Sequence, residues 1–272
     1  MNKVALITGA SSGIGKSTAK KLLKADYIVY GVSRRIEKMA DIKDLGANIL
    51  SMDITDDASI LNAVNAIINE QGRIDVLINN AGFGSYGAVE DVSVSEARYQ
   101  FEVNLFGLAR LTQLILPHMR KNKYGKIVNI SSMGGKIYAP LGAWYHATKH
   151  ALEGWSDCLR FEVKPFGIDV IIIEPGLIKT DWQNIAIKKL LESSGNTAYS
   201  ELANKTASIM KKTYAAPNVS EPELIADTIL KAVTSKNPKT RYAKGYLAKP
   251  YIFFRKILPD KIYEAIVRMS LK

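Results

Sequence analysis

The chain has 272 residues, which is enough for a sizeable core and typical of alternating α/β architectures that form one domain. It is 47% hydrophobic and 23% charged, so its composition excludes a disordered chain and a membrane-embedded one. No apolar run approaches the roughly 18 residues that a membrane-spanning helix needs, and because the first strand begins so early we expect no signal peptide. A single cysteine, Cys158, cannot form an internal disulfide, so we expect a reducing, cytoplasmic setting and interpret Cys158 as a packing residue.

The formal net charge is +11, and it is unevenly distributed. From Lys236 to the carboxyl end, ten Lys or Arg residues accompany only Asp260 and Glu264, which gives this segment a net charge of +8. Such a segment is typical of a solvated face, and also of contact with an anionic membrane surface or with nucleic acid. No nucleic-acid-binding motif accompanies the charge, so we expect no nucleic-acid partner.

Strand-like apolar runs alternate with helical patterns along most of the chain. Strands are expected at 3–8, 27–32, 47–51, 74–79, 125–131, 168–174 and near 240–243. Helical patterns are expected near 13–25, 56–71, 95–121 and 143–164. The alternation predicts βαβ units that build a parallel sheet with helices on both faces. No repeat or low-complexity linker divides the sequence, so residues 1–272 are predicted to form a single domain.

A glycine-rich turn from Thr8 to Gly15 follows the first strand and opens the first helix. Gly9 permits a tight turn, and Gly13 and Gly15 permit close approach of a phosphate and of the helix to the strand. Because backbone N–H groups at a helix amino terminus bind anions, this turn suits a pyrophosphate. Its Gly-x-x-x-Gly-x-Gly spacing differs from the commoner Gly-x-Gly-x-x-Gly pattern and is a moderate signal by itself.

The end of the second strand indicates which dinucleotide binds. An NAD site usually carries an acidic residue here that binds the ribose hydroxyls, whereas this chain has Ser33, Arg34 and Arg35. Guanidinium groups pair well with a phosphate, which favours NADP(H) over NAD(H). The alternative is that both arginines simply begin the next helix. After the third strand, Asp53 and Ile54 are well placed to hold the adenine.

Tyr145 and Lys149 are four residues apart in a predicted helix, so their side chains are neighbours on one face. An ammonium beside a phenol favours the ionised phenol, so we expect Lys149 to bring the pKa of Tyr145 down from ~10 toward working pH. A phenol with such a pKa is a usable general acid or base. Ser132 lies thirteen residues before Tyr145, at the end of an apolar strand. A Tyr-x-x-x-Lys match alone is weak, and it gains weight because the glycine turn and the serine precede it in order.

The stretch 177–215 interrupts the alternation, since it is helical in character but carries Ser193-Ser194-Gly195-Asn196 in its middle. Ligands of open parallel sheets bind beyond the carboxyl ends of the strands. This stretch follows such a strand, so we interpret it as a mobile lid over a substrate cleft, the alternative being an ordinary helical hairpin. An apolar, aromatic cleft suits small lipophilic ligands. Its expected lining is Phe83, Tyr86, Ile137, Tyr138, Leu141, Trp144, Leu177, Ile178 and Trp182.

The carboxyl-terminal extension, about 245–272, places apolar residues at helical spacing beside Lys and Arg residues. Pro259 divides it into two segments and suits a helix start. We favour packing of the apolar stripe on the lid or on a neighbouring subunit. The alternative is a peripheral membrane contact that collects a lipophilic substrate.

Taken together, these motifs resemble those of the classical short-chain dehydrogenase/reductase family, especially its hydroxysteroid and retinol dehydrogenase-like branch. The resemblance covers residues 3 to about 180 and is carried by Thr8 to Gly15, Asn80-Ala81-Gly82, Asn104, Ser132, Tyr145, Lys149 and Pro175-Gly176. It implies a Rossmann-type doubly wound α/β fold and a homodimer that pairs through the helices near 95–121 and 143–164. The run from Tyr145 to Gly154 is similar to that branch and implies a hydrophobic alcohol or ketone substrate.

The resemblance also implies a role for each matching residue. The implied cofactor-binding set is Gly9, Ser12, Gly13, Ile14, Gly15, Asp53, Ile54, Asn80, Ala81, Gly82, Tyr145, Lys149, Pro175, Gly176, Ile178 and Thr180, to which the strand-end argument adds Arg34 and Arg35. In catalysis, Ser132 would hydrogen-bond the substrate oxygen and Tyr145 would exchange its proton. Lys149 would bias the phenol, and Asn104 would hold a water in a proton relay. His146 stands where relatives often have serine, and we do not favour it as the base.

We therefore predict an NADP(H)-dependent oxidoreductase that transfers a hydride between nicotinamide and a hydrophobic ketone, aldehyde or secondary alcohol. An NADP(H)-binding regulatory or sensor protein without turnover is the alternative, but such a protein has no need of a proton donor. A protein that acts mainly at a membrane surface through its basic tail is a third hypothesis. No metal site is predicted.

Overall fold

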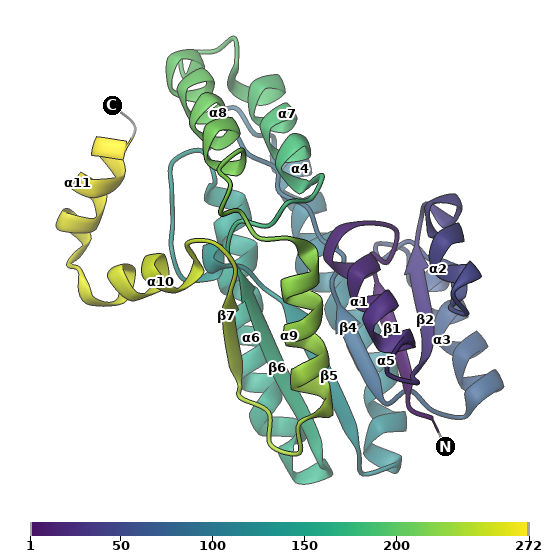
Figure 1. The fold of residues 1–272 in the computed structure, drawn as a ribbon. Helices are drawn as coiled ribbons and strands as arrows, with labels where there is room; N and C mark the ends of the chain where they lie inside the picture. The colour runs from purple at the N-terminus through teal and green to yellow at the C-terminus, as the bar shows by residue number, and fades with distance from the viewer. Residues whose placement is uncertain (1, 271–272) are drawn as a thin grey trace.

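The computed structural model describes residues 2–270, and within them the strands form one parallel sheet in the order β3-β2-β1-β4-β5-β6-β7 (Figure 1). The strands are β1 (Val4–Thr8), β2 (Ile28–Ser33), β3 (Asn48–Ser51), β4 (Val76–Asn79), β5 (Gly125–Ile130), β6 (Ile168–Pro175) and β7 (Arg241–Lys244). The strand order runs outward in both directions from β1 and β4, which is the doubly wound arrangement. The predicted α/β fold and single domain are confirmed.

Helices cover both faces of this sheet. Those that follow its strands are α1 (Gly13–Leu23), α2 (Ala40–Asp44), α3 (Asp57–Gln71), α4 (Val94–Phe101), α5 (Gly107–Lys121), α6 (Ala143–Val163) and α9 (Pro222–Thr234). Alternate residues of β1 face opposite layers, as strand geometry requires. Val4 and Leu6 belong to the core under α3, α5 and α6, whereas Ala5 and Ile7 belong to the core under α1 and α9.

The strand register brings four loops to one edge of the sheet. Thr8 at the end of β1 pairs with Val32, and Ile7 pairs with Ile78 in β4. Farther along the sheet, Asn79 pairs with Asn129 in β5. Because the strands are parallel, the loops that begin near residues 9, 80, 131 and 176 all leave from the same edge. These loops carry most of the residues that the sequence analysis singled out.

The helix expected near 95–121 contains a π-helical segment, Glu102–Phe106, between α4 and α5. Asn104 lies in this segment and is fully enclosed. Its side-chain nitrogen donates to the Phe83 carbonyl (2.9 Å) and to Thr148 Oγ1 (3.1 Å), and its oxygen accepts from the Phe83 amide (3.1 Å). π-helical turns are rare and occur frequently at functional sites.

Two parts of the structure differ from the sequence-based expectations. The helix α9 was not predicted, although Ile225, Ile229 and Val233 form a regular buried stripe and Pro222 lies at its first turn. The interpretation of Cys158 as a packing residue is wrong in this structure, because its side chain is exposed on α6. Its position in the helix points it away from the sheet, on the side where Phe161 is also exposed.

The stretch expected as a lid forms two helices, α7 (Trp182–Ser194) and α8 (Ser200–Tyr214), beyond the carboxyl edge of the sheet (Figure 1). Hydrogen bonds join their connecting region to the loop after β4. The Ala88 amide donates to Ser194 Oγ (2.9 Å), and the Tyr199 hydroxyl donates to Glu90 (2.7 Å). Ala88, Leu141 and Leu190 belong to a small core of their own at this end of the molecule.

The chain ends in two further helices, α10 (Ala248–Ile257) and α11 (Asp260–Ser270), which stand off from the sheet beside β7 (Figure 1). The division at Pro259 is the predicted one. Within residues 2–270, no helix is both long enough and apolar enough to cross a membrane.

Candidate active site

The glycine turn after β1 has the conformation that a phosphate cradle needs. Gly9 (φ +67°) and Gly13 (φ +52°) lie in the left-handed region that favours glycine. A Cβ atom on Gly15 would collide with the carbonyl oxygen of Gly9, so only glycine fits there. Ser12 precedes α1 and makes no side-chain cap. The first N–H groups of the helix therefore have no intrahelical or Ser12 side-chain partner and suit a pyrophosphate.

Thr8 and Asn80 lock this turn to the loop after β4. The Asn80 side chain donates to the carbonyl oxygens of Thr8 (2.9 Å) and Gly9 (3.3 Å). In return, Thr8 Oγ1 accepts from the amides of Asn80 (3.0 Å) and Ala81 (2.9 Å). The structure thus brings the predicted residues of both loops together at the point where the strand order reverses.

The two arginines after β2 turn toward this region and do not begin an α-helix. A short 3-10 helix starts only at Ile36. Arg35 donates to Ser11 Oγ in the glycine turn (3.2 Å). Arg34 donates to the Tyr99 hydroxyl (2.9 Å) and lies 3.9 Å from the Asp53 carboxylate. Both guanidinium groups therefore flank the end of the cleft where the adenosine ribose is expected.

Of the residues predicted for the nicotinamide end, the structure brings Thr180 to the glycine turn. Its Cγ2 atom would lie 3.0 Å from a Cβ on Gly13. Gly176 is covered by the backbone of Tyr246, where a Cβ would collide, and its amide donates to the Lys244 carbonyl (2.8 Å). Ile178 points its side chain into the core, where it is 5% exposed.

Ser132, Tyr145 and Lys149 come together at the start of α6. Ser132 caps a short 3-10 turn and accepts from the Gly134 amide (3.0 Å). A Cβ on Gly134 would lie 3.1 Å from the Tyr145 ring and 3.3 Å from Ser132 Oγ, so this glycine lets the two side chains approach. Ser131 instead points behind the turn, toward Gly135. Ser132 is therefore the serine beside the phenol.

The expectation that Lys149 lowers the pKa of Tyr145 is wrong for this structure. Burial raises the pKa of Tyr145 to about 12, opposed by the hydroxyl of Ser132, which lowers it. Lys149 is itself buried, and burial lowers its pKa to about 8 while Glu153 acts to raise it. Its ammonium donates to the Ile130 carbonyl (2.9 Å). The phenol is therefore protonated at neutral pH and is ready to donate a proton.

His146 is held as a structural side chain. Its Nδ1 atom lies 2.9 Å from the Gly134 carbonyl, and burial lowers its pKa, so the ring stays neutral. A ring nitrogen that faces a carbonyl must carry the hydrogen. His146 thereby fixes the same turn that Ser132 caps.

Tyr86 and Trp182 form an aromatic wall beside the phenol of Tyr145. The ring centroids of Tyr145 and Trp182 are 5.1 Å apart, and Tyr86 lies 5.6 Å from Tyr145 and 6.0 Å from Trp182. Burial raises the pKa of Tyr86 well above its ordinary value, and Tyr145 and Tyr214, the latter at the end of α8, act in the same direction. Sequence analysis did not select Tyr214, whose only signal is an aromatic residue at the end of the lid.

The remaining residues expected in the cleft divide between the site and the core. Beside the wall lies a hollow of about 460 Å³, lined by Ala88, Val89, Glu90, Pro140, Leu141, Tyr199 and Leu202. Phe83, by contrast, packs on Tyr99 with a centroid distance of 5.6 Å and is partly buried against the main core. Tyr138 is covered by Tyr263 of α11.

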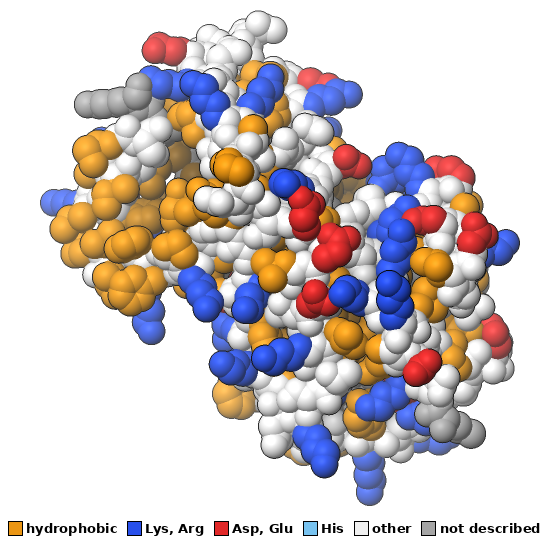
Figure 2. Space-filling model, in the orientation of Figure 1, with side chains coloured by type: hydrophobic (Ala, Val, Ile, Leu, Met, Phe, Trp, Pro, Cys, Tyr) orange, Lys and Arg blue, Asp and Glu red, His pale blue; other side chains and the backbone are white. Residues whose placement is uncertain are grey.

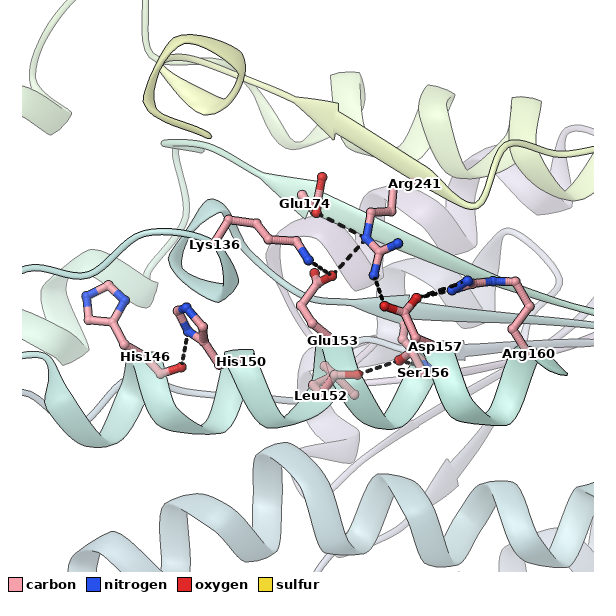
Figure 3. Close-up of polar contacts among 11 residues, drawn as sticks. Lys136, His146, His150, Leu152, Glu153, Ser156, Asp157, Arg160, Glu174 and Arg241 are labelled. Carbon is pink, nitrogen blue, oxygen red and sulfur yellow. Dashed lines mark hydrogen bonds and ion pairs between the residues drawn. The ribbon is translucent and has the colours of Figure 1, made fainter. Parts of the chain in front are cut away.

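A buried ionic cluster supports the site from behind (Figure 3). Glu153 is 3% exposed and pairs with Lys136 (2.8 Å) and Arg241 (3.0 Å). Arg241 also pairs with Asp157 (2.6 Å) and lies 3.6 Å from Glu174. Lys136 follows the Ser132 turn directly, and Glu153 lies one helical turn after Lys149. The cluster therefore links the Ser132 turn and the part of α6 that carries Lys149 to β6 and β7.

We expect replacement of Glu174 by Gln to stabilise the protein at alkaline pH. Burial raises the pKa of Glu174 to about 7 from an ordinary 4.5. The folded state thus binds more protons than the unfolded state between these values, and stability falls as pH rises through this window. The cost at pH 8 is at most about 3 kcal/mol. Unfolding in urea at pH 5 and pH 8 should show a gain for Glu174→Gln that is larger at pH 8.

The exposed Glu162 on α6 supplies the control, since Glu162→Gln should change stability equally little at both pH values. A gain for Glu174→Gln that is the same at pH 5 and pH 8 would contradict the assigned titration.

Comparison with known proteins agrees with this geometry. Residues 3–190 match the family described as short chain dehydrogenase. A 3-ketodihydrosphingosine reductase of Bacteroides thetaiotaomicron is 38% identical over 98% of this chain and 97% of its own. A solved short-chain dehydrogenase from Streptomyces avermitilis is 33% identical, with a TM-score of 0.82 over 98% of this chain and 96% of its own.

A second solved structure bears on the cofactor. The 3-ketoacyl-(acyl-carrier-protein) reductase of Brucella melitensis, complexed with NADH, is 26% identical, with a TM-score of 0.74 over 88% of this chain and 94% of its own. Its likeness to this chain, together with the glycine turn at the start of α1, supports a nicotinamide cofactor. With the family match over residues 3–190 and the relatives that span nearly the whole chain, we conclude that the protein belongs to the short-chain dehydrogenase family of oxidoreductases.

Proposed function

We propose that the protein is an NADP(H)-dependent oxidoreductase that interconverts hydrophobic ketones or aldehydes and alcohols. The observation that carries this proposal is the placement of Ser132, Tyr145 and Lys149 beside the aromatic wall and next to the loop after β4, which Asn80 joins to the glycine turn. A binding protein without turnover has no use for a buried phenol aimed at a serine hydroxyl.

The nicotinamide, when bound, supplies or accepts the hydride. In the reducing direction, Ser132 donates a hydrogen bond to the carbonyl oxygen of the substrate, where negative charge develops. Tyr145 is protonated at neutral pH and gives its proton to that oxygen as a general acid. Lys149 lies one helical turn away, where its ammonium would hold the nicotinamide ribose when the cofactor is bound.

The surroundings of the phenol support a hydrophobic substrate. Tyr86 and Trp182 form an apolar face beside Tyr145, and the adjoining hollow is lined mainly by aliphatic and aromatic side chains. Such a lining favours ligands with a large apolar surface. The name of the Bacteroides relative, a 3-ketodihydrosphingosine reductase, supports reduction of a ketone.

The preference for NADP(H) rests on Arg34 and Arg35. Arg34 is 63% exposed at the side chain and is therefore available to a ligand, and Arg35 reaches the glycine turn. No acidic residue occupies the first positions after β2. A ribose phosphate would pair with these guanidinium groups, whereas ribose hydroxyls carry no charge for them to pair with.

We also propose a homodimer that pairs through α5 and α6. Phe106, just before α5, is 53% exposed, and Phe161 on α6 is 80% exposed. Exposed aromatic side chains on long helices favour association, because pairing removes them from water. Light scattering should give twice the mass of the chain, and a Phe161→Ser variant should shift the mass toward that of a monomer. A monomeric wild-type protein would contradict this proposal.

The function is tested by NADPH consumption with a panel of carbonyls that runs from small polar ketones to bulky apolar ketones and aldehydes. We expect turnover with the bulky apolar members. Tyr145→Phe should abolish this turnover while NADPH binding, followed by fluorescence, survives, because the variant removes only the proton that the alcohol needs. Near-normal turnover in Tyr145→Phe would remove the assigned acid. Tight NADPH binding without turnover on any member would favour the sensor function.

The cofactor preference is tested by Arg34→Ala. Loss of a charge-assisted hydrogen bond costs about 1.5–3 kcal/mol, so NADPH affinity should fall by about 10- to 100-fold. NADH affinity should change little, because NADH lacks the phosphate. Lys24→Ala, at the opposite end of α1 from the glycine turn, is a control that removes an exposed positive charge. Equal losses for NADPH and NADH in Arg34→Ala would refute the phosphate role.

A further inference from the structure

The C-terminal arm, which we define as α10 and α11 (residues 248–270), exposes an unusual number of large apolar side chains. They are Tyr251 (43% exposed), Phe253 (57%), Phe254 (50%), Ile257 (54%), Ile262 (49%), Ile266 (46%) and Met269 (64%). Within the arm only Ala248 and Tyr263 are buried. Contiguous apolar surface of this kind marks an interaction site.

Helical spacing groups these side chains on the open sides of both helices. In α10, Phe253 and Ile257 are four residues apart, and the rings of Phe253 and Phe254 lie 5.8 Å apart. In α11, Ile262, Ile266 and Met269 follow one face. Figure 2 shows the result as a broad hydrophobic area on the left of the molecule, with Lys and Arg side chains around it.

The arm is attached to the body through a small number of specific contacts. The Tyr263 hydroxyl donates to the Tyr138 carbonyl (2.9 Å), and their ring centroids are 5.0 Å apart. The Arg255 guanidinium lies over both rings, at 5.0 and 5.3 Å, and pairs with Asp260 (2.8 Å). These contacts fix the direction in which the apolar face points.

The charge of the arm decides between possible occupants of this face. Lys249, Lys256, Lys261 and Arg268 are exposed around it. Within residues 248–270, five basic residues accompany Asp260 and Glu264, which gives the arm a net charge of +3. A symmetric pairing of two arms would place two such basic segments against each other, and their repulsion would oppose the contact. An anionic bilayer offers both an apolar interior and opposite charge.

We propose that the C-terminal arm docks the protein on an anionic lipid bilayer. The apolar side chains of α10 and α11 enter the boundary between headgroups and acyl chains, and the lysines and Arg268 contact anionic headgroups. Because Tyr138 belongs to the segment that joins Ser132 to Tyr145, docking places this side of the active site next to the lipid. The inference does not rest on turnover, since it concerns binding to a surface.

The test is co-sedimentation of the full chain with vesicles of phosphatidylcholine, alone or mixed with phosphatidylglycerol. We expect binding to the anionic vesicles that weakens at high salt. The charge reversals Lys256→Glu and Lys261→Glu, made together, should weaken binding at least tenfold, because each basic residue near the surface is worth about 1 kcal/mol. Phe254→Ser with Ile257→Ser should weaken it comparably.

Matched controls lie elsewhere on the surface. Lys205→Glu with Lys231→Glu makes the same change in net charge outside the arm, and Leu45→Ser with Leu61→Ser makes the same kind of apolar-to-polar change. Both control pairs should bind vesicles like the wild type. Thermal melting and light scattering of every variant establish that it is folded and give its mass.

Three results would overturn the proposal. One is the absence of binding to anionic vesicles by the wild type. Another is a pattern of lost vesicle binding that indicates adsorption by net charge without the apolar face. This pattern is an equal loss of binding in the arm and control variants, or a loss of binding in the charge-reversal pair alone. The third is a halved mass for Phe254→Ser with Ile257→Ser while the vesicles remain unbound, which would assign the face to a second copy of the chain.

Discussion

The hydrogen bonds between Thr8 and Asn80 are the interaction on which the site depends most. They join the loops after β1 and β4, the two strands from which the sheet extends in opposite directions. With these loops locked, the glycine turn has a fixed position relative to Gly82, and Gly82 in turn lies against Asn104 and Lys149. The cofactor cradle and the catalytic helix are therefore joined through the loop after β4.

Along α6, burial shifts the pKa values of Tyr145 and Lys149 more than contacts with charged side chains do. Tyr145, Lys149 and Glu153 succeed one another at four-residue intervals and are all less than a tenth exposed. Burial disfavours ionisation of a phenol and protonation of an amine, so the pKa of Tyr145 rises and that of Lys149 falls. Glu153 contacts Lys136 and Arg241 behind this helix face. The helix thus presents a neutral proton donor to the cleft and keeps its ion pairs behind it.

Much of the fold and of the candidate site was predictable from local sequence. The alternation of apolar runs indicated the parallel sheet, and the order of Ser132, Tyr145 and Lys149 indicated where the chemistry lies. Features set by tertiary contacts were not predictable. The π-helical segment at Asn104 depends on its bonds to Phe83 and Thr148, and the pKa of Tyr145 depends on how completely the phenol is enclosed. The helix α9, by contrast, carries a regular apolar stripe after Pro222, a signal that local sequence does hold.

The attachment of the helices α7 and α8, which we interpret as a lid, has a consequence for how substrate range can change. The helices α7 and α8 share their small core with Ala88 and Leu141 and are hydrogen-bonded to Ala88 and Glu90. Tyr86, which faces the phenol, lies two residues before Ala88 and packs against the same core. The helices α7 and α8 and the segment that carries Tyr86 therefore form one packed unit, although they are far apart in the sequence. A graft of residues 182–214 onto another member of the family would carry the shape of this cleft only if residues 83–92 were transferred with it.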